Sequence, residues 1–153
     1  MSQIEMIVDQ LRRSFDGEAW HGPALVEVLE GIDASTAASR PMAAAHSIWE
    51  LVLHITAWEG VVERRIHGEA LTLTHEENFG HISAQTEDAW REAISKLRKT
   101  HEKLISTVSS LQESQLTATV PGKHYDFAFM LLGAVQHAAY HGGQIALLKK
   151  ARK

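Results

Sequence analysis

Hydrophobic residues recur at intervals of three and four positions in four long stretches of the chain, and this period is typical of α-helices with one buried side. Each of the first three stretches follows a residue that caps helix N-termini, namely Ser2, Ser47 and Thr86. Glu50 lies three residues after Ser47, and this pair forms a capping-box pattern. The pattern therefore predicts long helices over about residues 2–17, 48–66, 86–111 and 126–150.

The segments between these helices differ in character. After Gly22 and Pro23 break the chain, residues 24–29 are predicted to form a short helical piece. Residues 33–45 are small and polar and predict a long connection, whereas residues 68–85 show no period and predict a long functional loop or a crossover. Because the chain has no convincing strand, it is predicted to form one all-α domain over residues 1–153, a four-helix bundle with long crossover connections.

Composition excludes several classes of function. With 15 basic and 19 acidic residues, a net charge of −4 and no long run of like charge, we expect no nucleic-acid partner. No stretch approaches membrane-spanning length and the N-terminus has no secretion-signal pattern, so we expect no membrane association and a cytoplasmic location. The chain has no cysteine, so thiol chemistry would require a thiol that a ligand brings in.

A pair of histidines in the last predicted helix suggests a metal site. His137 and His141 are four residues apart, so both rings leave the same side of the helix, one turn from each other. That side also carries apolar residues, so the imidazoles point toward the core, where neutral nitrogens suit a divalent metal. The pair is no H-E-x-x-H protease motif, because Ala138 stands where that motif has its glutamate.

A third ligand is needed, because catalytic metal sites usually have three protein ligands and one open position. His54 lies in the middle of the second predicted helix, on the same apolar side as Leu51 and Trp58, and is the preferred third ligand. His101, on the apolar side of the third helix, is the rival. The alternative interpretation is that these are core histidines that donate to backbone carbonyls, and for His101 this interpretation is favoured.

The residues around these histidines resemble the DinB/YfiT superfamily. The resemblance rests on Ser47-Ile48-Trp49-Glu50-Leu51-Val52-Leu53-His54 with Trp58-Glu59, and on His137-x-x-x-His141-x-Gly143-Gln144-Ile145 in the last helix. It implies a four-helix bundle whose divalent metal is held by His54, His137 and His141, and a homodimer. It also implies an activity like that of its members, which resemble thiol-dependent transferases and isomerases using bacillithiol or mycothiol, or metal-dependent hydrolases.

We therefore expect a metal-dependent enzyme of the thiol-dependent S-transferase or isomerase type, or of the hydrolase type, acting on a small-molecule substrate. The expected ion is zinc or nickel, with iron, copper or manganese as alternatives, and a low-molecular-weight thiol is a candidate co-substrate. Glu59 and Tyr140 are the nearest candidates for proton transfer. Neither lies on the ligands' own side, however, so a solvated Glu59 and a packed Tyr140 are expected.

Gln144, three residues after His141, can support a metal ligand or a water through its amide. The alternative function is a non-catalytic metal-binding module in a stress response or in protein interaction. An open position on the metal would favour the enzyme, whereas a fourth protein ligand would close the site and favour the module.

Overall fold

The computed structural model describes residues 1–151, and the regular structure of these residues is helical. The long helices are α1 (Gln3–Asp16), α4 (Ile48–Ile66), α6 (Glu87–Ser109) and α7 (Phe127–Ala151). The shorter elements are α2 (Leu25–Leu29), α3 (Ala34–Ala38), α5 (His75–Phe79) and the 3-10 turn η1 (Glu113–Gln115). The prediction of an all-α fold is confirmed.

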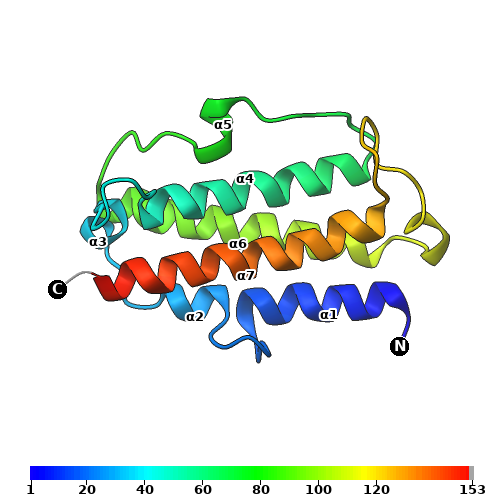
Figure 1. Cartoon of the computed structure of the whole chain (residues 1–153), viewed down its shortest axis with the longest axis horizontal. Coiled ribbons are helices and arrows are strands. Elements are labelled where there is room, and N and C mark those ends of the chain that lie inside the picture. Colours follow the sequence, from blue (N-terminus) through cyan, green and yellow to red (C-terminus); the bar gives the residue numbers. More distant parts are fainter. Residues whose placement is uncertain (152–153) are drawn as a thin grey trace.

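The four long helices pack around a common core, in which α4 and α1 each contact both α6 and α7 (Figure 1). In Figure 1, α4 and α6 run in the same direction, whereas α7 runs opposite to α4. The connection between α4 and α6 therefore returns along the length of the bundle, and α5 lies in it. This crossover holds α5 against α4, while the opposed directions of α4 and α7 pair the middle of one helix with the middle of the other.

The helix starts follow the predicted capping residues. The hydroxyls of Ser2, Ser47 and Thr86 accept hydrogen bonds from backbone N–H groups three residues later, at 3.1, 3.2 and 3.2 Å. Each bond satisfies one of the N–H groups that the first turn of a helix leaves without an internal partner. As a result, α4 has the predicted bounds, and α1 and α6 begin directly after their predicted caps.

Two segments differ from the prediction, because the connection at 33–45 contains α3 and the loop at 68–85 contains α5. Both helices are capped, since Asp33 accepts from the Thr36 N–H at 2.7 Å and Thr74 from the Glu77 N–H at 3.2 Å. Five residues make about one and a half turns, so neither helix is long enough to show a hydrophobic period.

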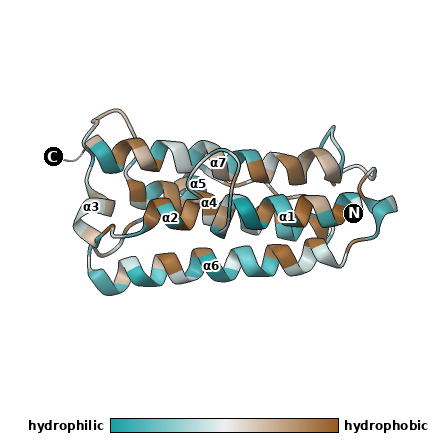
Figure 2. Ribbon diagram, turned by 90° about the horizontal axis from the view of Figure 1, so that it is seen from below, coloured by the Kyte–Doolittle hydropathy of each residue, from teal (hydrophilic) through white to brown (hydrophobic). Residues whose placement is uncertain are grey.

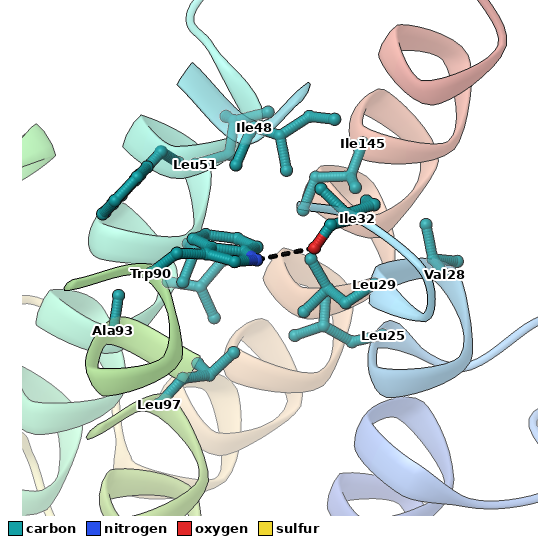
Figure 3. Packing of buried hydrophobic residues seen from close by; sticks show 14 of the residues in the cluster. Leu25, Val28, Leu29, Ile32, Ile48, Leu51, Trp90, Ala93, Leu97 and Ile145 are labelled. Atoms are coloured by element: carbon teal, nitrogen blue, oxygen red, sulfur yellow. Dashed lines mark hydrogen bonds between the residues drawn. The ribbon is translucent and has the colours of Figure 1, made fainter. Parts of the chain in front are cut away.

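The core near the C-terminal end of α7 is built around Trp90 of α6. Its indole Nε1–H donates to the carbonyl oxygen of Ile32 at 2.7 Å, and apolar side chains from α2, α4 and α7 surround the ring (Figure 3). A second apolar cluster lies between α1, α6 and the start of α7. The ribbon of α6 alternates hydrophilic and hydrophobic residues along its length (Figure 2). Within residues 1–151, no helix combines the length and the apolar character that crossing a membrane requires.

Candidate metal centre

The three histidines that the sequence suggested as ligands meet between α4 and α7. The Nε2 atom of His137 lies 3.0 Å from Nε2 of His54 and 3.1 Å from Nε2 of His141. His54 and His141 are buried and His137 is half-buried. Because α4 and α7 run in opposite directions side by side, a histidine near the middle of α4 faces two that are one turn apart on α7.

Hydrogen bonds on the far side of two rings set their tautomers. Nδ1 of His54 lies 2.8 Å from the carbonyl oxygen of Asn78, and Nδ1 of His141 lies 2.6 Å from Oε1 of Gln144. A carbonyl oxygen only accepts, so each Nδ1 carries the hydrogen and each Nε2 keeps its lone pair. Both lone pairs then point toward the Nε2 atom of His137. Gln144 thus lies where it can orient His141, and Asn78 plays the same part for His54.

The spacing of the three nitrogens suits one ion. Two nitrogens that each lie about 2.0–2.1 Å from a common ion are about 3.0–3.4 Å apart for angles of about 95–110° at the ion. The observed separations of 3.0 and 3.1 Å are at the short end of that range. Within residues 1–151, no fourth histidine, cysteine, aspartate or glutamate belongs to the group. The group therefore offers three side-chain nitrogens that could hold one ion.

The three rings are held in their neutral form. Burial lowers the pKa of His137 to about 3, and the neighbouring charges of His141 and His54 act in the same direction. Burial also lowers the pKa of His54 and of His141, against the opposing effect of their hydrogen bonds to Asn78 and Gln144. A metal competes with protons for these nitrogens. Because their pKa values are lowered, the three rings stay free of the competing proton at pH values below the usual pKa of histidine.

The crossover covers the outer side of His54. The ring of Phe79, the last residue of α5, stacks on His54 with ring centroids 4.3 Å apart, and His46 stacks on Phe79 at 3.7 Å. The indole Nε1–H of Trp58 donates to Oδ1 of Asn78 at 2.8 Å. The sequence prediction does not include Asn78 and Phe79, because it gives residues 68–85 as a loop, although the Thr74–Glu77 capping box marks the start of α5.

A cavity of about 190 Å³ adjoins His137 and extends between α4 and α7. Its lining is mostly apolar and includes two ionisable side chains of α4, Glu59 and Arg65. Glu59 was expected in solvent, and this prediction was wrong, since the residue is only 5% exposed. It lies one turn from the buried Ile55 and faces α6, where Nδ1 of His101 is 2.9 Å from Glu59 Oε1.

His54, His137 and His141 are called the metal group below. His101 lies in the core and outside this group, as the favoured interpretation predicted, but its partner is a carboxylate and not a backbone carbonyl. Phe15 stacks on its ring at 3.8 Å with the planes 4° apart. Glu59 Oε2 and His101 Nε2 are buried and have no hydrogen-bond partner among the described residues. The pair thus fixes one oxygen of Glu59 and leaves the other free beside the cavity.

Tyr140 was expected to be packed, and this prediction was also wrong, because the residue is 65% exposed. Its ring meets His141 edge-on with centroids 5.0 Å apart, and it borders a second pocket of about 440 Å³, which His141 and Gln144 also line. The side chains of α7 are apolar in nearly every direction, so the period in the sequence does not tell which apolar residues face outward.

The model of the DinB superfamily matches residues 19–145, which include α4, the greater part of α7 and the three histidines. The chain therefore belongs to the DinB superfamily. A search of curated proteins found no match, and neither did a search of solved structures.

We expect the stability of the metal-free protein to decrease as the pH falls below about 6.5, the ordinary pKa of histidine. Unfolded His137 takes up a proton there, whereas the buried ring stays neutral down to about pH 3. Unfolding is thus coupled to proton uptake between these values, so lower pH favours the unfolded state. Urea unfolding in the presence of a chelator, between about pH 4 and pH 7, measures this dependence.

The variant His137→Gln removes one group that takes up a proton on unfolding. Its free energy of unfolding should therefore decrease less steeply as the pH falls. His21→Gln, which changes an exposed histidine outside the metal group, is the matched control and should keep the wild-type slope. Equal slopes in His137→Gln and the wild type would contradict the neutral, buried state of this ring.

Proposed function

We propose that the protein is a divalent-metal-dependent enzyme that acts on a small molecule, of the thiol-dependent S-transferase or isomerase type or of the hydrolase type. The observation that carries this proposal is the convergence of three Nε2 atoms, with no fourth side-chain ligand among residues 1–151, at the end of a cavity. A structural site would be expected to fill its coordination with protein ligands. Substrate would enter between α4 and α7.

His54, His137 and His141 would hold the ion, and Asn78 and Gln144 would orient two of the rings. Three imidazoles suit zinc or nickel first, and iron, copper or manganese are alternatives that metal analysis would distinguish. Such an ion would supply a Lewis acid that lowers the pKa of a water or thiol binding to it.

Glu59 is the proposed group for proton transfer. It borders the same cavity as His137, and its Oε2 atom has no partner among the described residues. The bond from His101 to Oε1 holds the carboxylate in place, so Oε2 can accept the proton that the nucleophile gives up. Tyr140 borders the second pocket instead and would take no part in this transfer.

In the thiol branch of the proposal, the nucleophile is a low-molecular-weight thiol, because the chain has no cysteine of its own. A free thiol of this kind persists in a reducing compartment. For a thiol-dependent activity we therefore propose a cytoplasmic location.

Metal binding is tested by titrating zinc and nickel into metal-free protein. We expect stoichiometric binding that His54→Ala, His137→Ala and His141→Ala each abolish, since each removes one ligand atom. Gln144→Ala should weaken binding by about 10–100-fold, the usual effect of losing a partner of a ligating histidine. Circular dichroism should remain helical throughout, because the two apolar clusters are formed without the metal.

The control is His101→Gln, which changes a buried histidine outside the group and should keep stoichiometric metal binding. Loss of metal in this variant, with retention in His54→Ala, would overturn the ligand assignment.

Catalysis is tested by screening the metal-loaded protein for thiol transfer to electrophiles and for hydrolysis of activated esters and amides. An activity of this protein should fall by about 10²–10⁴-fold in Glu59→Gln, which keeps the shape of the side chain and removes its basicity. Glu63→Gln, one turn further on α4, is the matched control, because its carboxylate pairs with Lys103 outside the cavity. Metal binding without any turnover would favour the non-catalytic module.

We propose further that two copies associate through the outward side of α7. The exposed large apolar residues of this helix are Phe129, Leu132, Tyr140 and Leu147. A helix that is apolar on nearly all sides is usually covered on all sides, and an exposed apolar patch of this kind marks an interaction surface. Sedimentation should show a dimer, and Leu147→Lys should dissociate it. The control Lys150→Ala, on the same helix, should remain dimeric. A monomeric wild type would refute this proposal.

A further inference from the structure

Arg65, near the C-terminal end of α4, is a buried cation at the end of the cavity away from His137. Only 3% of the residue is exposed, although it lines the cavity. Its Nη1 donates to the hydroxyl of Tyr125 at 3.1 Å and its Nη2 to the carbonyl oxygen of Leu71 at 2.9 Å. Its Nε–H is buried and has no acceptor among residues 1–151.

The charge of Arg65 has no carboxylate partner in the part of the chain that the structure describes. The acidic residues nearest to it in sequence pair with other cations, Glu63 with Lys103 at 3.1 Å and Glu69 with Arg64 at 2.5 Å. A buried charge without a counter-ion is costly, since neutral acceptors compensate only part of the lost hydration. An anion that enters the cavity would supply the missing partner.

The space beside Arg65 suits the apolar part of such an anion. The guanidinium lies over the ring of Trp58, with Cζ 5.7 Å from the ring centroid, and Val62 and Phe129 line the cavity nearby. Gly133 of α7 also lines it, and a Cβ atom added there would meet nothing within 4 Å. Glycine inside a helix lowers stability relative to alanine by about 1 kcal/mol, and here its missing side chain leaves the cavity open.

The two ends of the cavity differ in charge. Glu59 and His137 lie at the metal end, whereas Arg65 and Tyr125 lie at the other. From Phe129 to His137 the cavity follows two turns of α7, about 12 Å at 1.5 Å per residue. In the metal-free protein, an anionic group is repelled by the Glu59 carboxylate and attracted by the guanidinium, so these charges favour one orientation there.

We propose that this cavity binds an organic carboxylate with an apolar or aromatic body. The carboxylate pairs with Arg65 and the Tyr125 hydroxyl, the body packs on Trp58 and Val62, and the opposite end of the molecule points toward His137. The planar fork of a guanidinium matches a carboxylate, with two parallel N–H···O bonds. The role of this ligand as substrate rests on the proposed metal-dependent function, but its binding to Arg65 requires no metal.

The test uses phenylacetate and its neutral isostere phenylacetamide, titrated into metal-free and zinc-loaded protein and followed by NMR. We expect phenylacetate to bind both forms, and phenylacetamide to bind at least about tenfold more weakly, because a hydrogen bond to a charged group is lost. Arg65→Gln should lower the affinity for phenylacetate by at least about tenfold and the affinity for phenylacetamide by less, because the amide is uncharged and keeps only one acceptor oxygen. Arg64→Gln removes an exposed arginine of the same turn and should change neither.

Since Arg65→Gln leaves Tyr125 and Leu71 with altered partners, a second variant keeps the test decisive if the first does not fold. Gly133→Leu fills the cavity, leaves Arg65 in place, and should abolish binding of both probes. The proposal is overturned if phenylacetate fails to bind, if it binds as well to Arg65→Gln or to Gly133→Leu, or if it binds only in the presence of zinc. If the protein binds zinc but not phenylacetate, only this inference fails. If it binds phenylacetate but does not bind zinc, only the proposed metal site fails.

Discussion

The arrangement of the site depends on the close approach of three imidazole nitrogens in a space largely closed to water. The Nε2 atoms are 3.0 and 3.1 Å apart in neighbouring pairs, and two of them present lone pairs because their Nδ1 atoms donate elsewhere. The Nε2 atom of His137 faces both of these lone pairs. It can donate a hydrogen to them, or in its other neutral tautomer it adds a third lone pair directed at the same point. A cation is the natural occupant of such a point. The opposed directions of α4 and α7 and the crossover that carries α5 all serve to maintain this geometry.

The same pair of helices also arranges charge along the cavity. The metal group lies at one end with the Glu59 carboxylate, which His101 holds from α6, and the buried guanidinium of Arg65 lies at the other. Glu59 and Arg65, which both line this cavity, each have a buried hydrogen-bonding atom without a partner among residues 1–151. Unsatisfied buried polar atoms lower stability, so their position around one cavity is better explained by ligand binding than by folding.

Much of this could be predicted from the sequence. Periodicity and caps located the long helices, and the His137–His141 spacing placed two rings on one side of α7. The local pattern left His54 and His101 as rivals, and only the packing of α4 against both α6 and α7 separates them, since it directs His54 toward α7 and Glu59 toward His101. The part played by α5 was missed because five residues carry no period, and the exposure of Tyr140 because α7 is apolar on opposite sides.

We propose that three imidazoles hold one divalent ion and leave it open to substrate. X-ray absorption spectroscopy of the zinc-loaded protein tests this directly, because it counts the imidazole groups around the ion and measures their distances. The three-histidine site predicts three imidazole nitrogens at about 2.0–2.1 Å together with at least one oxygen donor that an added thiol replaces by sulfur. Fewer than three imidazoles, or a fourth protein donor that an added thiol does not displace, would contradict it.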